Sequence, residues 1–104
     1  MEFVETSIFT QRITKLLTDD EYHDLQAMLA EHPRAGDVIP GAGGLRKLRW
    51  RATGRGKRGG LRVIYYRWSE DHLYMIFVYD KARQGDLTPE QLKALRAYVE
   101  EGVL

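Results

Sequence analysis

The sequence contains no cysteine and no long hydrophobic run. Without thiols the chain cannot form disulfides, hold a metal through thiolates or use a cysteine nucleophile, and this composition fits a reducing compartment. No apolar stretch approaches the ~18–20 residues that a membrane-spanning helix needs. Near the N-terminus, Glu2 and Glu5 stand where a signal peptide has a basic region and an apolar core. We therefore expect a cytoplasmic protein with no membrane partner.

Acidic residues are missing from a long internal segment. Between Asp37 and Glu70 there are nine basic residues and no acid, so residues 38–69 carry a formal charge of +9. The nine are Arg46, Lys47, Arg49, Arg51, Arg55, Lys57, Arg58, Arg62 and Arg67. The rest of the chain has 7 basic and 15 acidic residues, a formal charge of −8. The two regions together give the net charge of +1, which therefore does not reveal the basic segment. Such a concentration of cations is typical of a surface that binds nucleic acid, and the alternative is a solvated, arginine-rich hairpin.

Histidine is scarce and is absent from the basic segment. His23, His32 and His72 share no metal-ligand spacing, and no Ser/His/Asp set accompanies them. We interpret all three as structural or merely exposed. Because carboxylates are scattered and thiolates are absent, we expect no zinc site and no cofactor.

The apolar pattern predicts one domain over residues 1–104, since this length is that of a single small domain. Apolar residues recur at helical spacing over residues 7–17, which predicts a first helix. Thr18 and Glu21 form a capping box, which predicts that a second helix begins there and ends near Pro33. A second capping box at Thr88 predicts a C-terminal helix. A strand is expected at 2–6, a loop at 34–44, and strands at 45–52, 60–68 and 72–79.

These elements predict an α+β fold in the order β-α-α-β-β-β-α, with a mainly antiparallel sheet, an N-terminal helical hairpin and a C-terminal helix. The segments 60–68 and 72–79 are apolar on both faces and should be the central strands. In 45–52, Lys47 and Arg49 alternate with Leu48 and Trp50. This strand should lie near an edge or line a concave face.

Between the first two of these strands lies Gly54-Arg55-Gly56-Lys57-Arg58-Gly59. Its glycine spacing matches a dinucleotide-binding motif, but that motif must open a helix and here a strand follows. It does not complete a P-loop either, because residue 51 is arginine and residue 58 is neither serine nor threonine. We interpret the segment as a hairpin tip that contacts a nucleic-acid backbone, with a fixed phosphate cradle as the less favoured alternative.

Aromatic residues lie among the cations. Most should be core, and one or two should face the basic surface, where a base could stack. The set is Trp50, Tyr65, Tyr66, Trp68, Tyr74 and Tyr79. Just after the last strand, Lys81 and Arg83 should lie close to where the central strands open into loop.

An ordered set of segments resembles the RelE/ParE toxin superfamily, and within it the HigB-like branch of bacterial type II toxin–antitoxin systems. The segments are Gly43-Gly44-Leu45-Arg46-Lys47-Leu48-Arg49-Trp50, Gly56-Lys57-Arg58-Gly59-Gly60-Leu61-Arg62-Val63-Ile64-Tyr65-Tyr66, Tyr79-Asp80-Lys81 and Asp86-Leu87-Thr88. The residues Phe9-Thr10 through Leu17, and Asp20-Glu21-Tyr22 with Leu25-Gln26, fit the helical hairpin of the same family. The resemblance implies a RelE-like toxin that enters the ribosomal A site and cleaves translated mRNA. Such an endoribonuclease (an mRNA interferase) transfers the phosphoryl group to the neighbouring 2′-hydroxyl without a metal.

Carried over by position, the resemblance implies that Arg62 is a catalytic residue that binds the phosphate and stabilises the transition state. It also implies catalytic roles for Lys47 or Arg49 and for Lys81. Further contacts with mRNA or ribosomal RNA are expected from Arg46, Arg51, Arg55, Lys57, Arg58 and Arg83. Some relatives have a catalytic tyrosine near the C-terminus. Here Tyr98 looks like core, which leaves Tyr79 as a possible base-stacking residue or proton donor.

The implied partners are the ribosome with its mRNA and a cognate antitoxin, whose complex with the toxin binds operator DNA through the antitoxin. Two other functions fit the same residues: a ParE-like inhibitor of DNA gyrase without nuclease activity, and a nonenzymatic nucleic-acid-binding module. The basic strand and loop favour RNA cleavage, because inhibiting gyrase does not require a phosphate-transfer site.

Overall fold

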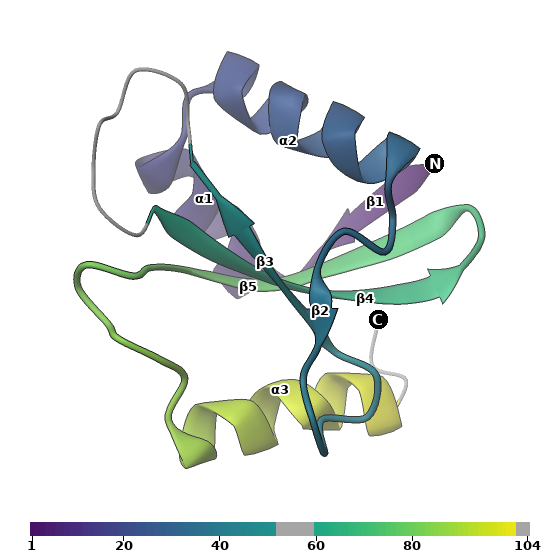
Figure 1. Ribbon diagram of the computed structural model, residues 1–104, viewed down its shortest axis with the longest axis vertical. Helices are drawn as coiled ribbons and strands as arrows, with labels where there is room; N and C mark the ends of the chain where they lie inside the picture. The colour runs from purple at the N-terminus through teal and green to yellow at the C-terminus, as the bar shows by residue number, and fades with distance from the viewer. Residues whose placement is uncertain (52–59, 102–104) are drawn as a thin grey trace.

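The structure, a computed structural model, describes residues 1–51 and 60–101 (Figure 1). Within these residues the elements are β1 (Glu2–Glu5), α1 (Ser7–Leu16), α2 (Asp19–Glu31), β2 (Asp37–Val38), β3 (Arg46–Trp50), β4 (Leu61–Ser69), β5 (His72–Asp80) and α3 (Pro89–Glu100). The mixed α+β fold predicted from the sequence is confirmed. In the same described part of the chain, no helix combines the length and the apolar character needed to cross a membrane.

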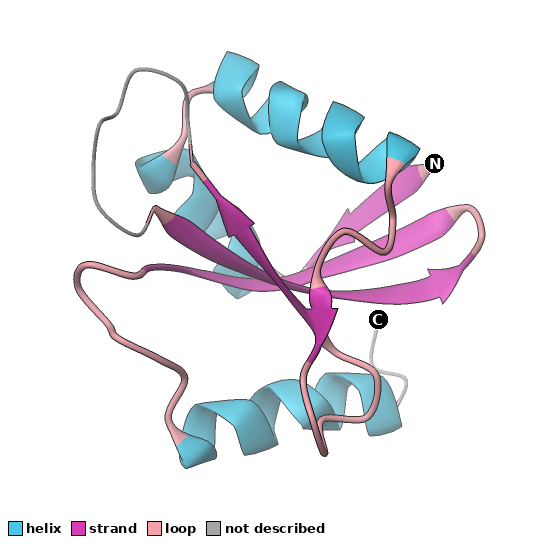
Figure 2. Cartoon of the chain, viewed as in Figure 1, coloured by secondary structure: helices cyan, strands magenta, loops and turns pink. Residues whose placement is uncertain are grey.

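The strands form one sheet in the order β1-β5-β4-β3-β2. Neighbouring strands are antiparallel except at β1, which runs parallel to β5. Helices α1 and α2 lie on one face of the sheet and α3 lies on the other (Figure 2). As the sequence predicted, β4 and β5 are the central strands, and β3 lies next to the short strand at one edge.

The prediction of a plain loop over residues 34–44 is wrong at one point. Asp37 and Val38 form β2 and pair with Lys47 and Arg46 of β3. The element order therefore has one more strand than the sequence pattern predicted. A two-residue strand is too short for alternation to be visible, and it exists here because the chain turns back on β3 at Ile39–Leu45, where the Ile39 N–H donates to the Leu45 carbonyl.

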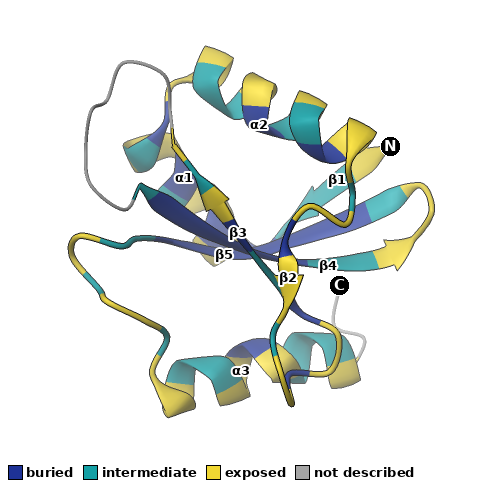
Figure 3. Ribbon diagram, viewed as in Figure 1, coloured by how far each residue is buried: buried dark blue, intermediate teal, exposed yellow. Residues whose placement is uncertain are grey.

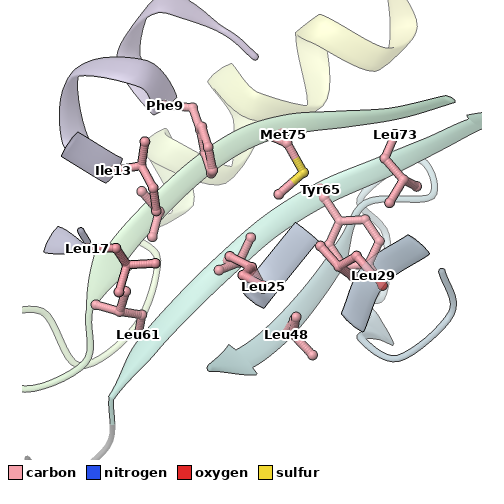
Figure 4. Packing of buried hydrophobic residues seen from close by; sticks show 12 residues of the cluster. Phe9, Ile13, Leu17, Leu25, Leu29, Leu48, Leu61, Tyr65, Leu73 and Met75 are labelled. Atoms are coloured by element: carbon pink, nitrogen blue, oxygen red, sulfur yellow. The ribbon is translucent and has the colours of Figure 1, made fainter. Parts of the chain in front are cut away.

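Two hydrophobic layers enclose the sheet. The first lies under α1 and α2, where Phe9, Leu25 and Leu29 are fully buried against Tyr65 and Met75 (Figure 4). The second lies under α3 and includes Ile64, Ile76 and Leu95, with Tyr98 packed against it as expected. Because side chains alternate along a strand, both faces of β4 and β5 are apolar through their centres.

Hydrogen bonds from N-cap side chains fix the residues at which the helices begin. The Thr6 hydroxyl accepts from the Phe9 N–H at 3.1 Å and donates to the Ile76 carbonyl at 2.7 Å, which ties the start of α1 to β5. Both predicted capping boxes are confirmed, at Thr18 with Glu21 and at Thr88 with Gln91. The second fixes where the chain leaves the β5 loop and enters α3, next to the site described below.

Candidate nucleic-acid interface

The face of the sheet that carries α3 also carries a cluster of cations. Lys47 pairs with Ile64 in register, and Arg49 pairs with Arg62. Directly opposed residues on neighbouring strands share a face, and Ile64 belongs to the core under α3. This face has a cleft of about 560 Å³. Its lining residues are Ala35, Asp37, Lys47, Leu48, Arg49, Arg62 and Lys81.

Arg62 stands at the centre of this arrangement. Its neighbours across the two strand pairs are Arg49 on β3 and Tyr79 on β5. The residue is only 5% exposed, yet it borders the cleft, and its Nη1 donates to the Leu61 carbonyl at 3.3 Å. A guanidinium held on a central strand and largely withdrawn from water is fixed in position, and its charge is less screened than a surface charge.

Direct opposition of Arg49 and Arg62 is an unfavourable feature of the sheet. Like charges at paired positions, with Cβ atoms ~5 Å apart, destabilise an antiparallel pair. An anion bound in the cleft would relieve this repulsion, and a phosphate suits the planar, two-pronged donor geometry of guanidinium groups. The arrangement therefore favours binding of a phosphate group from the solvent side.

Asp86, in the loop between β5 and α3, connects two of the candidate residues. Its Oδ1 lies 3.6 Å from the Lys47 Nζ, and it accepts from the Tyr79 hydroxyl at 3.5 Å and from the Leu87 N–H at 2.9 Å. The Leu87 hydrogen bond, followed by the positive charge of Lys47, lowers the pKa of Asp86 below its ordinary value. Asp86 is therefore an anion at neutral pH, and it lies beside Lys47.

Tyr79 is buried behind these charges, at 1% exposure. Burial is the main reason that the pKa of its hydroxyl is raised above the ordinary value of 10.0, and the Asp86 carboxylate adds to the rise while Arg62 opposes it. The phenol therefore stays protonated at neutral pH. Because the ring is covered, neither of its faces is accessible to a base in this structure.

A second hollow of about 280 Å³ adjoins the cleft and is lined by Arg49, Trp50, Arg51 and Arg62. Trp50, which is half-buried, borders this hollow, but it alternates with Arg49 along β3 and packs against the core under α1 and α2. On the other side of Arg62, Lys81 is held near the cleft because its N–H donates to the Gly60 carbonyl at 3.0 Å and its Nζ donates to the Gly85 carbonyl.

Most of the chain, including most of the site, matches a known protein family. Residues 37–101 match the family described as the RelE toxin of the RelE/RelB toxin–antitoxin system. The match covers more than half of the chain and runs from β2 to the end of α3. The chain belongs to the RelE toxin family. Membership implies a toxin of a toxin–antitoxin system with a cognate antitoxin, and toxins of this family generally inhibit translation and act as endoribonucleases.

Apart from Ala35, every residue that lines the cleft lies within the RelE-family match, but the candidate residues named from the sequence are not all brought together. Lys47, Arg49, Arg62 and Lys81 line the cleft, and Arg51 lines the adjoining hollow. Arg55, Lys57 and Arg58, with the glycine-rich segment that carries them, lie outside the described residues.

Two other candidates lie elsewhere. The guanidinium of Arg46 donates to the carbonyl of Gly36 at 2.7 Å and to that of Arg34 at 3.5 Å, so in this structure it braces the connection between α2 and β2. Arg83 lies in the turn after β5 and, in the part of the chain that the structure describes, is not among the residues lining the cleft. Both are more distant from the centre of the site than their place in the sequence indicated.

Asp37 and Asp86 are the residues of this site that sequence reasoning missed. Both are acids, and a search for cations does not single them out. Asp86 stands two residues before the N-cap Thr88, and this position was the available signal, because the capping box fixes where the loop ends and α3 begins. Its contacts with Lys47 and Tyr79 required the folded structure.

Proposed function

We propose that this chain is a ribosome-dependent mRNA endoribonuclease of the HigB-like kind, which cleaves translated mRNA in the ribosomal A site and arrests growth. The observation that carries the proposal is the placement of Arg62, Arg49 and Lys47 on adjacent strands around one cleft of a RelE-family chain. A ribosome-bound message would enter this cleft from the open side. The site of action would be the cytoplasm, and the toxin–antitoxin complex would bind operator DNA through the antitoxin.

The chemistry requires three tasks. The 2′-oxygen of one nucleotide attacks the adjacent phosphorus, the bond from phosphorus to the 5′-oxygen breaks, and the proton lost by the 2′-hydroxyl is balanced by one gained at the 5′-oxygen. The products are a 2′,3′-cyclic phosphate and a 5′-hydroxyl end. Negative charge grows on the phosphoryl oxygens in the transition state, so positioned cations accelerate the step.

We assign the phosphate to Arg62 and Arg49, whose paired positions converge on the cleft. The proton transfers are assigned to the side-chain nitrogens of Lys47 and Lys81, which line the same cleft: one of them, as a neutral amine, accepts the proton of the 2′-hydroxyl, and the other, as an ammonium, donates a proton to the 5′-oxygen. Lysine can act in acid–base catalysis when nearby positive charge lowers its affinity for a proton. Arg51 and the Trp50 hollow extend the surface along the RNA backbone.

The test uses ribosomes programmed with a short defined mRNA. The purified chain should cut the ribosome-bound message and leave 5′-hydroxyl ends, while the same message free in solution should remain largely intact. A 2′-deoxy substitution at the nucleotide on the 5′ side of the cut should abolish cleavage there, because the attacking oxygen is gone. Continued cleavage of the deoxy message would refute transfer to the 2′-hydroxyl.

Asp86→Asn should strengthen RNA binding. The substitution removes the anion that pairs with Lys47, and because such an exposed pair is weak, we expect a gain of about two- to fivefold in affinity. Fluorescence anisotropy with a labelled single-stranded RNA at several salt concentrations measures the gain. Asp24→Asn makes the same change in net charge on an exposed position of α2 and should leave the affinity unchanged. Equal gains in both variants would show that only net charge matters.

Tyr79→Phe should retain cleavage within about threefold of the wild type. The hydroxyl is buried and directed at Asp86, so we propose an indirect role for Tyr79, through the loop that carries Asp86. Removal of a direct proton donor would instead reduce the rate by about 10²- to 10⁴-fold. Because the pKa of Tyr79 is raised above 10.0, its ionisation should also leave no step in the pH–rate profile below that value.

A further inference from the structure

The far end of the β4–β5 hairpin presents an exposed tryptophan. Trp68 is 56% exposed, the largest fraction among the big hydrophobic residues of the described chain. Tyr74 stacks against it with ring centroids 5.5 Å apart and an interplanar angle of 14°, and His72 meets it edge-on at 4.9 Å. Figure 3 shows that exposure rises toward this end of the hairpin, while the middles of β4 and β5 are buried. We call Trp68, His72 and Tyr74 the aromatic surface.

This surface is held in place by its neighbours. Both ring nitrogens of His72 have a partner, since Nδ1 lies 2.8 Å from the Ser69 hydroxyl and Nε2 lies 3.0 Å from a carboxylate oxygen of Glu2. Tyr74 is buried beneath the indole. A tryptophan held on a rigid base loses little freedom on binding, and exposed tryptophans of this kind often dominate the affinity of protein interfaces.

The charge around the aromatic surface is opposite to that of the cleft. Glu70 and Asp71 form the turn of the hairpin, Glu2 pairs with His72, and all three acids are exposed. Trp68 is six residues from Arg62 along β4, a separation of about 20 Å at ~3.3 Å per residue. The acids repel RNA phosphates, whereas an indole face bordered by carboxylates attracts the cationic side chain of arginine or lysine.

We propose that the aromatic surface is a docking site for the cognate antitoxin, with an arginine or lysine of the antitoxin stacked on Trp68 and paired with Glu70 or Asp71. Family membership implies this partner, so the proposal does not depend on RNA cleavage. It places one antitoxin contact far from the cleft. The antitoxin then binds the toxin through a contact that does not compete with phosphate for the cations of the cleft.

The test compares toxicity with neutralisation. The antitoxin is defined as the protein whose co-expression restores growth to cells that make the wild-type chain. Trp68→Ala, and the double variant Glu70→Lys with Asp71→Lys, should stay toxic but bind purified antitoxin at least tenfold more weakly by titration calorimetry. Trp68→Phe, which keeps an aromatic face, should stay within about threefold of the wild type. Ile8→Ala, at an exposed apolar position on α1, is the matched control and should bind as the wild type does.

Each other outcome overturns part of the proposal. Unchanged antitoxin affinity of a folded Trp68→Ala chain would refute the docking site. A folded Trp68→Ala chain that loses toxicity would assign the surface to the toxin's target instead. Weakening by Trp68→Ala but not by the double charge reversal would refute the cationic anchor. If the wild-type chain arrests growth without cutting RNA, the proposed nuclease function fails, while growth and antitoxin binding still test the docking site.

Discussion

Replacing Arg62 with glutamine is expected to slow cleavage of ribosome-bound mRNA by at least about 100-fold while the chain stays folded. Loss of one positioned charge that stabilises a developing oxyanion typically costs 10²- to 10³-fold in rate. Arg62 is the most buried of the cleft cations, and its place on a central strand between Arg49 and Tyr79 fixes it in position at the cleft. Glutamine keeps hydrogen-bonding groups and much of the side-chain length. Cleavage rate, circular dichroism and thermal unfolding together measure the result.

Lys93→Gln is the matched control for this prediction. It removes one positive charge from an exposed position of α3 and should leave cleavage within about threefold of the wild type. If both variants lose activity equally, total charge and not the position of Arg62 explains the effect. A folded Arg62→Gln chain that cleaves at the wild-type rate would refute the assignment of Arg62.

Leu25→Ala should lower the free energy of unfolding by about 2–5 kcal/mol, the range for a large-to-small change at a fully buried leucine. Leu25 lies between α2 and the sheet, on the face opposite the cleft. A domain of this size is stable by only about 5–15 kcal/mol, so the variant should unfold at clearly lower urea concentration. Leu16→Ala, at a half-buried position of α1, should cost less.

The Leu25 variant also separates stability from chemistry. Its cleavage rate per folded molecule should equal that of the wild type at temperatures where it remains folded, because the cleft cations stand on the other face of the sheet. A loss of rate in the folded protein would show that the α2 layer controls the geometry of the cleft. Urea unfolding and single-turnover cleavage on one preparation provide the comparison.

Much of the fold follows from local signals in the sequence. The capping boxes at Thr18 and Thr88 specify helix starts through hydrogen bonds within four residues, and both are present. The apolar character of both faces of β4 and β5 identifies the central strands. The pairing of β2 with β3 and the parallel pairing of β1 with β5 depend on contacts between distant segments, so periodicity alone does not reveal them.

In the candidate site, too, some features could be predicted from the sequence and others depend on the folded structure. Lys47 and Arg49 stand two residues apart on one strand and therefore share a face, which alternation alone indicates. Their meeting with Arg62 depends on strand register, since a shift of one residue would place Arg62 opposite a residue of the other face. The contacts of Asp86 with Lys47 and Tyr79 depend on the path of a loop, and the exposure of Trp68 depends on how the folded elements pack around the end of β4.

The most direct test of the central claim is a map of RNA 5′ ends in cells after induction of the wild-type chain or of Arg62→Gln, with DNA supercoiling measured in the same cultures. We expect new 5′-hydroxyl ends inside translated codons in cells with the wild-type chain, none above background with the variant, and unchanged supercoiling in both. Growth arrest with intact messages and altered supercoiling would contradict the account and point to gyrase as the target.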